Sequence, residues 1–279
     1  MDLNLITNKL NAINQVGKRP NQGEKIDYTK YFWKPQPGKH QIRILPSKVN
    51  KANPFREVFF HYGFAKGPVL ALSNWGESDP IIEFAQKLRQ TKDRDNWILA
   101  KKVEPKMRVF VPVVVRGEEE KGARLWEFGQ QIYKTLLGIA ADEDYGDFTD
   151  IADGRDFTID ADYTEVAGRR VVGCTVRVKP KTTPISEDPQ LVEKWLNDQP
   201  DILTINKKRE YDDIKSLLEK WLNPDEEETQ TVTPSQPQSQ PQTESTSTWN
   251  SDNALTQEER KNFQLNVNPT DKFDELFND

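Results

Sequence analysis

Apolar and polar positions alternate along several stretches of the chain, a pattern typical of strands with one buried face. In QIRILPSK, Ile42 and Ile44 lie on one side and Arg43 on the other. RVFVPVVV (108–115) is rich in β-branched residues, and Pro112 inside it predicts an edge strand or a bulge. Further on, DFTIDADYTEV and RRVVGCTVRVKP flank a two-residue turn at 167–168 and predict a hairpin.

Other stretches have apolar positions at helical spacing. PIIEFAQKLRQ predicts a helix over 80–90 with Pro80 at its start. WEFGQQIYKTLLGIAAD (126–142) predicts a short helix, and two amphipathic helices, at 189–195 and 209–223, close the folded body. Together with the strands, these helices predict an α+β fold that is mainly β with α additions.

The two ends of the chain differ from this body. Residues 1–22 predict an arm whose apolar positions share one helical face, and because so short a helix is marginal in water, the arm is expected to dock on its own body or on a neighbour. Residues 224–270 are mostly Pro, Gln, Ser, Thr and Glu and predict a disordered linker. The final DKFDELFND (271–279) is an acidic peptide with apolar side chains at helical spacing. Its candidate partner-binding residues are Phe273, Asp274, Glu275, Leu276 and Phe277.

The composition favours a soluble, cytoplasmic protein. Only 35% of the residues are hydrophobic, and the mean hydropathy is -0.82. No apolar run of about 18 residues is present, and the first residues lack the pattern of a secretory signal. Cys174 is the single cysteine, which fits a reducing compartment, and with only two histidines the chain cannot assemble a His/Cys zinc site.

Charge is distributed unevenly along the chain. Residues 1–110 hold 20 Lys and Arg against 10 Asp and Glu, a net charge of +10. Residues 111–223 hold 16 against 23 (net -7) and residues 224–279 hold 3 against 12 (net -9), which gives -6 overall. This asymmetry predicts a front that binds a polyanion and an acidic tail, although solvated charged faces are the alternative.

The basic front is also rich in aromatic residues, with thirteen in the first 110 positions. Proteins bind single strands by combining cations for the phosphates with rings on which unpaired bases stack. Trp75 and Trp97 stand in polar surroundings and are candidates for stacking, whereas Phe59, Phe60 and Phe84 are expected in the core.

Two basic groups accompany these rings. One borders the first strand and the loop after it, and the other is expected in a single polar loop, 101–108. No helix carries a set of base-reading side chains, so sequence-specific reading of a duplex is not expected. The residues that this pattern predicts to bind single-stranded DNA are Arg43, Lys48, Lys51, Arg56, Lys66, Trp75, Trp97, Lys101, Lys102, Lys106 and Arg108.

Catalytic signatures are absent from the sequence. It contains no Walker loop, no GxSxG elbow and no HExxH. The pairs Asp142/Asp144 and Asp160/Asp162 have residue types that bind divalent metals, but nothing nearby completes a site, so we interpret them as solvated carboxylates. The chain is therefore not expected to be an enzyme.

Five blocks of this sequence resemble, in the same order, the single-stranded DNA-binding (helix-destabilising) proteins of T-even-type tailed bacteriophages. The blocks are QIRILPSK (41–48), HYGFAKG (61–67), RVFVPVVV (108–115), LWEFGQQIYKTL (125–136) and the acidic terminus DKFDELFND. The resemblance implies an OB-fold core (23–223) with an inserted helical subdomain around 62–92, a flexible N-terminal arm and a disordered acidic tail.

In function, the resemblance implies a protein that coats single-stranded DNA cooperatively and without sequence preference during phage replication, recombination and repair. It implies an arm that supports self-association along DNA (here Lys9, Lys18 and Arg19) and a tail that contacts phage replication and recombination proteins and competes with DNA for the cleft. It also places Trp97, Lys101 and Lys102 along that cleft and assigns Trp126 to a further aromatic position.

The chain departs from the family at two places. The type member holds zinc with one His and three Cys, but here the corresponding stretch (61–84) has no Cys. Asp79 and Ile82 fall near the last two ligand positions, and Tyr62, not His61, fills the histidine position. We therefore predict that the zinc site is lost and that apolar packing holds the subdomain through Val69, Leu70, Ile81, Ile82 and Phe84. The arm is also less basic than in the family, so cooperativity is less secure than binding itself.

Two other functions agree with the sequence. One is an interaction scaffold that acts through its acidic tail, with the basic half merely a solvated surface. The other is an RNA-binding regulator, because RNA single strands are bound through the same stacking.

Overall fold

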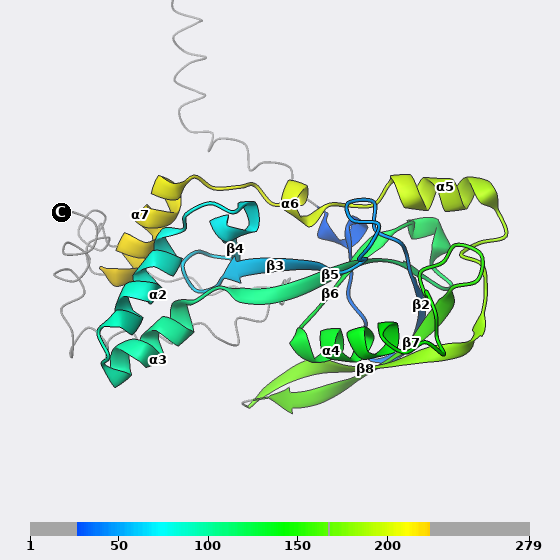
Figure 1. The fold of residues 1–279 in the computed structure, drawn as a ribbon, viewed down its shortest axis with the longest axis horizontal. Coiled ribbons are helices and arrows are strands. Elements are labelled where there is room, and N and C mark those ends of the chain that lie inside the picture. The colour runs from blue at the N-terminus through cyan, green and yellow to red at the C-terminus, as the bar shows by residue number, and fades with distance from the viewer. Residues whose placement is uncertain (1–26, 167, 224–279) are drawn as a thin grey trace, which may run out of the picture.

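The apolar run 106–115 forms a long strand, β5 (Lys106–Val115), which pairs with three others and lies at the centre of the sheet. The computed structural model describes residues 27–166 and 168–223 (Figure 1). The other strands are β1 (Phe32–Trp33), β2 (Gly38–Ile44), β3 (Arg56–His61), β4 (Val69–Leu70), β6 (Arg124–Phe128), β7 (Arg155–Val166) and β8 (Arg169–Thr182). The α-helices are α2 (Pro80–Gln90), α3 (Arg94–Val103), α4 (Gln130–Ala140), α5 (Pro189–Asn197), α6 (Ile202–Ile205) and α7 (Tyr211–Leu222).

The strands form one mixed sheet in the order β1-β6-β5-β2-β7-β8, and β3 joins it beside β5 with β4 at its outer side. The predicted α+β class, mainly β with helical additions, is confirmed, and the OB-fold core stays a prediction of the resemblance. The predicted hairpin is also confirmed, because β7 and β8 pair as far as Val166 opposite Arg169. None of the helices in the described part of the chain has the length and apolar character needed to cross a membrane.

Pro112 lies in the central strand, so the prediction of an edge strand or a bulge there is wrong. On one side of β5, β3 pairs with residues 106–110, and β2 pairs with residues 113–115. Pro112 stands where one partner replaces the other, and its carbonyl still accepts a hydrogen bond from the Leu45 amide at 2.9 Å. The missing N–H of proline falls at this change of partner, where no ladder bond is lost.

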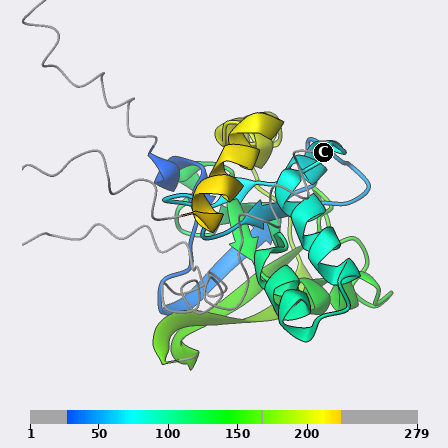
Figure 2. The same cartoon turned by 90° about the vertical axis from the view of Figure 1, so that its left-hand side faces the viewer.

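Apolar side chains gather in two main clusters. One lies under α4, between this helix and the sheet, and contains Ile42, Ile44, Val113 and Trp126. The other lies at the far end of the molecule, where α2 and α3 pack with α7 (Figure 2). The region predicted as an inserted subdomain around 62–92 thus shares its core with α3 and with a helix from the other end of the described chain.

Four of the α-helices in the described residues agree with a helix predicted from the sequence, whereas α3 and α6 were not predicted. The helix over 80–90 is confirmed as α2, whose first turn is capped by the Asp79 carboxylate. The helices predicted at 189–195 and 209–223 are found as α5 and α7. The one predicted over 126–142 is found as α4 but begins only at Gln130, because Trp126 and Phe128 belong to β6. The prediction of a single polar loop over 101–108 is wrong, because Lys101 and Lys102 form the last turn of α3 and β5 begins at Lys106.

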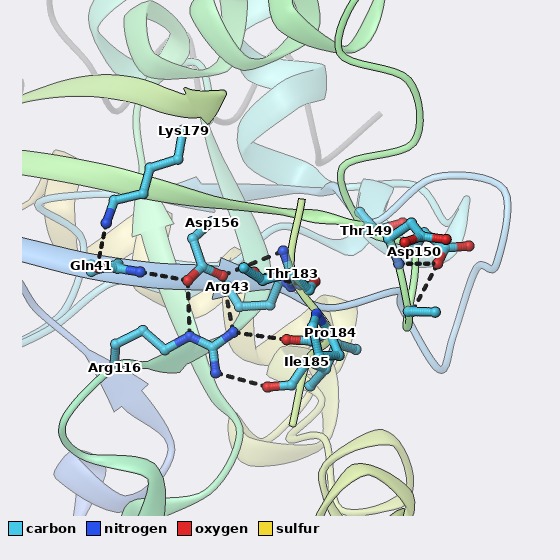
Figure 3. A network of polar contacts seen from close by, with 12 residues as sticks. Gln41, Arg43, Arg116, Thr149, Asp150, Asp156, Lys179, Thr183, Pro184 and Ile185 are labelled. Carbon is cyan, nitrogen blue, oxygen red and sulfur yellow. Dashed lines mark hydrogen bonds and ion pairs between the residues drawn. The ribbon is translucent and has the colours of Figure 1, made fainter. Parts of the chain in front are cut away.

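Arg43 lies opposite Asp156 in the ladder between β2 and β7, and its side chain is fully buried. Its Nη1 lies 3.3 Å from Asp156 Oδ1, and Arg116 donates two hydrogen bonds of 3.0 Å to the same carboxylate (Figure 3). Gln41 donates a third at 2.6 Å, and the Arg43 guanidinium also bonds the Thr183 carbonyl. The expectation that Arg43 contacts phosphates is therefore wrong. The alternation along β2 correctly places Arg43 on the face opposite to Ile42 and Ile44, but that face is also buried, and Asp156 lies on it.

We expect Asp156→Asn to lower the free energy of unfolding by about 3–5 kcal/mol, because it leaves the buried charge of Arg43 uncompensated. Denaturant unfolding measures the change. Asp160→Asn is the matched control on the same strand, since the partner of Asp160, Arg177, is largely exposed, and it should cost less than about 1 kcal/mol. Equal losses in the two variants would contradict a structural role for the buried network.

Candidate nucleic-acid interface

A cleft opens where two strand pairings stop short. β1 pairs with only Leu125 and Trp126 of β6, so no described strand lies beside Glu127–Gly129 on that side. β2 pairs with β7 only as far as Ala161, and beyond it β7 and β8 continue as a two-stranded ribbon. The cleft lies between this ribbon, the open edge of β6 and the segment after β1.

The cleft has two adjoining parts that share Tyr62, Arg108 and Gly129. The larger has a volume of about 470 Å3 and the smaller about 310 Å3. Cations reach it from three directions: Lys34 follows β1, Lys106 and Arg108 lie on β5, and Arg170 comes from β8. Aromatic and apolar groups make up much of the remaining wall: Tyr62, Met107, Trp126, Phe128, Ile132, Tyr163, Val171, Val172 and Cys174.

The inner face of the ribbon supplies one wall of the cleft. Phe157 and Ile159 point into the core from β7, and Tyr163 lies on the same face of this strand, past the end of β2. There it is 49% exposed, and the guanidinium of Arg170 lies 3.8 Å from the centre of its ring. One face of the ring thus carries a cation, which leaves the other for a flat partner.

The opposite wall holds a polar group around Arg108. Its Nε lies 3.5 Å from the Tyr62 hydroxyl and 3.6 Å from Glu127 Oε1, so both of these contacts are long. Burial raises the pKa of Tyr62, whose hydroxyl is protonated at neutral pH in any case. Burial also raises the pKa of Glu127, against the opposing effect of Arg108 and Lys34.

The N-terminus of α4 opens onto the same cleft. Gly129 is the N-cap residue and makes no side-chain capping bond, and Gly129 and Gln130 both line the smaller part. The first N–H groups of a helix lack partners within the helix and add partial positive charge at this end. The cleft therefore combines four basic side chains, exposed rings and a helix N-terminus.

A second hollow, of about 530 Å3, lies beside α5, but its chemistry differs. It is lined mainly by apolar groups, with Glu193 as its charged residue and no basic side chain among the lining residues. Phosphates need cations within reach, so this hollow is a poor place for a polyanion.

The structure brings only some of the predicted binding residues together. Lys106 and Arg108 line the cleft, and the Lys106 ammonium donates a hydrogen bond of 2.7 Å to the Lys101 carbonyl, which places the end of α3 beside it. Trp97 lies one turn earlier on α3, 47% exposed, with Arg89 and Lys101 each less than 6 Å from its ring centre.

Other predicted residues lie elsewhere. Lys48 donates to the Asn197 carbonyl and Arg56 pairs with Asp201, so both tie the segment before α6 to the sheet. Lys51 and Lys66 are exposed in loops, and Trp75 is half-buried beneath the ammonium of Lys208. The predicted arm residues Lys9, Lys18 and Arg19, and the tail residues from Phe273 to Phe277, lie outside the described residues.

Trp126 requires a correction. It is 1% exposed and packs against Trp33 and Phe128 with ring centres 5.7 and 4.7 Å apart. A base cannot stack on a ring that is covered on both sides, so Trp126 supports the floor of the cleft from within. It alternates with Glu127 on β6, and this alternation puts the indole in the core and the carboxylate in the cleft.

Four cleft residues escaped the sequence reasoning: Lys34, Tyr62, Tyr163 and Arg170. Tyr163 and Arg170 belong to a hairpin whose alternation indicates an inner face, but nothing local shows that β2 ends before them. Lys34 directly follows β1 and Tyr62 directly follows β3, and a basic or aromatic residue just past a strand end is a usable signal for the rim of a cleft.

Such a cleft, with cations and rings along an open groove, has the chemistry of a surface that binds a nucleic-acid strand. The family model described as gp32 DNA binding protein like matches residues 36–223, well over half of the chain. The chain therefore belongs to this family of DNA-binding proteins, which is not a family of enzymes. A search of curated proteins found no match.

The residues around His61 do not fit a zinc ion of the kind that the family resemblance implies. In the described part of the chain, no three His, Cys, Asp or Glu side chains gather as metal ligands. His61 Nε2 lies 2.9 Å from Asp79 Oδ2, and the same carboxylate accepts backbone N–H bonds from Leu72, Ile81 and Ile82. Val69, Ile81 and Phe84 belong to the cluster shared with α7, whereas Leu70 lies in a neighbouring cluster and Ile82 is half-buried.

The charge of Asp79 contributes to stability at neutral pH. Burial raises its pKa, but the hydrogen bond and attraction from His61, together with the N–H donors of Leu72 and Ile82, outweigh burial, so the pKa lies below 3.8. A carboxyl with a lowered folded-state pKa stabilises the fold above its unfolded-state pKa, and this stabilisation is lost as the pH falls through the folded-state value.

We expect Asp79→Ala to lower the free energy of unfolding by about 2–4 kcal/mol, because it removes a helix cap and leaves buried His61 without its partner. Asp188→Ala removes a cap alone, from α5, and should cost about 1 kcal/mol. A chelator should leave the melting temperature of the wild type unchanged. A melting temperature that falls on chelation, or equal losses in the two variants, would contradict this account.

Proposed function

We propose that this chain is a single-stranded DNA-binding protein without sequence preference, and that the strand lies in the cleft between the β7–β8 ribbon and the open edge of β6. The observation that carries the proposal is Tyr163, half-exposed on the cleft wall and paired with Arg170, opposite the basic rim formed by Lys34, Lys106 and Arg108. Bases stack on such rings whatever their identity, while the cations neutralise phosphates.

Beyond the cleft, the strand is expected to continue along the end of α3. Lys106 is hydrogen-bonded to Lys101, and Trp97 presents an exposed indole between two cations next to it. Arg89, one of these two cations, is itself held by a two-bond pair with Glu104, so the ring and its flanking charge are kept in place. This arrangement supports Trp97 and Lys101 as outer contacts, with Lys102 on the same turn.

On the level of the cell, we propose that the protein coats single strands in the cytoplasm of an infected bacterium during phage DNA replication, recombination and repair. The tail peptide would recruit replication and recombination proteins through Phe273, Leu276 and Phe277, with acidic residues around them. The arm, with Lys9, Lys18 and Arg19, would support self-association along the strand. These roles rest on the family and on the sequence.

We expect Tyr163→Ala to weaken binding to oligo-dT about 5- to 100-fold, which corresponds to one lost stacking contact. The slope of log affinity against log salt should stay unchanged, at about -3 for four neutralised phosphates, because no charge is removed. Fluorescence titration at several salt concentrations measures both quantities. Tyr28→Ala is the control: Tyr28 is 42% exposed, close to the value for Tyr163, and does not line the cleft.

The result for Tyr163 distinguishes the candidate functions. Loss of binding in Tyr163→Ala but not in Tyr28→Ala supports the cleft. Equal binding of oligo-dT by the wild type, Tyr163→Ala and Tyr28→Ala would refute the proposal that the strand lies in the cleft. Tighter binding of an RNA strand than of DNA of equal sequence would favour the RNA-binding alternative.

Removing residues 224–279 should strengthen binding to oligo-dT at low salt, because the tail carries a net charge of -9 that competes with DNA for the basic residues. The gain should fade as salt screens the charges. Phe273→Ala with Phe277→Ala keeps the charge and should leave DNA binding unchanged. A truncated protein that no longer binds DNA would favour the scaffold, in which the tail is the active part.

A further inference from the structure

We propose that Glu127 is a built-in counter-ion of the cleft: it holds Arg108 in the free protein and gives it up to a DNA phosphate. This inference rests on the proposed function and concerns the exchange that binding requires. Of the described residues that line the two parts of the cleft, Glu127 is the one carboxylate among four basic side chains.

The register of the sheet fixes this position. Glu127 lies opposite Phe110 across the β5–β6 ladder, so Arg108 is its diagonal neighbour on the same face. Lys34, directly after β1, lines the same cleft, and its charge acts on the same carboxyl group. The carboxylate thus lies beside Arg108 and feels the charge of a second cation that a phosphate would need.

The contact between Arg108 and Glu127 is suited to exchange. At 3.6 Å from Nε to Oε1 it is an ion pair and not a hydrogen bond, and the Tyr62 hydroxyl at 3.5 Å is equally distant. The Arg108 side chain keeps 28% of its surface exposed, against 18% for Glu127. Because this part of the Arg108 side chain stays exposed, an incoming phosphate can reach it and bind the guanidinium in the two-bond geometry that Arg favours.

Such a counter-ion has two measurable consequences. The carboxylate repels the phosphate that takes its place, so it lowers affinity. It also neutralises part of the Arg108 charge before DNA arrives, so fewer counter-ions are released on binding and the salt dependence is shallower than four cations would give. A small anion, which makes only one contact, then competes poorly with Glu127 for Arg108. A long DNA strand competes better, because its other phosphates bind the remaining cations.

A neutral side chain should be tolerated at this position. Burial already raises the pKa of Glu127, which means that the surroundings favour its uncharged form. Two variants, Glu127→Gln and Glu127→Met, remove the charge with nearly the same shape, and thermal unfolding shows whether each is folded. Either one suffices for the test.

We expect these variants to bind oligo-dT about three- to tenfold more tightly than the wild type at low salt. The slope of log affinity against log salt should be steeper by about 0.7, as for one additional neutralised phosphate. The control is Glu118→Gln, which makes the same change in net charge by breaking a pair with Arg124, 2.6 Å apart and outside the cleft, and it should behave as the wild type.

Three results would overturn the inference: unchanged or weaker binding by the folded variants, an equal gain in Glu118→Gln, or a gain with oligo-dC that is absent with oligo-dT. The last would mean that Glu127 contacts bases. A wild type that binds no oligo-dT even at low salt would refute the proposed function itself, so the two failures are separable.

Discussion

β2 stops pairing with β7 at Gly38, opposite Ala161, whereas β7 and β8 stay paired to the turn at Gly168. This difference in strand length makes the cleft. A ribbon without a third strand has an inner face that nothing in the sheet covers, and here that face carries Tyr163 on one strand and Arg170 on the other. Because β1 also ends after two residues, the edge of β6 lies open across from it. The proposed binding surface thus lies where strands end, and its position follows from the hydrogen-bond register.

The same register decides which arginines are structural and which face solvent. Arg43 and Arg108 both alternate with apolar residues on their strands, yet Arg43 is paired across a complete ladder with Asp156, and Arg108 lies near the end of β5 where β6 turns into α4. A guanidinium inside a continuous sheet must have its charge compensated by the protein. Near a strand end it keeps contact with water and can exchange partners. The position of an arginine along its strand, more than the local sequence, therefore decides whether it supports the fold or is available to a ligand.

This distinction explains what the sequence could predict. Periodicity was enough for α2, whose apolar face, proline start and Asp79 cap agree, and for the β7–β8 hairpin. It failed for α3, because charged residues outnumber the inward Leu99, Ala100 and Val103. Basic and aromatic content pointed to Lys106 and Arg108, which line the proposed cleft, but not to Tyr163 and Arg170, which lie outside the basic front. Composition could not exclude Arg43 and Trp126 from the binding site. Arg43 is buried because it pairs with Asp156, which is distant in the sequence, and Trp126 is buried because Trp33 of the neighbouring strand packs against it.

The helical end of the molecule keeps its shape through one buried polar pair and a shared apolar core. His61 and Asp79 form a buried pair that fixes the start of α2, but two side chains cannot hold four segments together as a bound ion does. The remaining constraint comes from α7, whose Ile214, Leu218 and Trp221 complete the core of α2 and α3. In the chain, α2 and α3 precede the β7–β8 ribbon and α7 follows it, so the helical end is connected to the sheet on both sides.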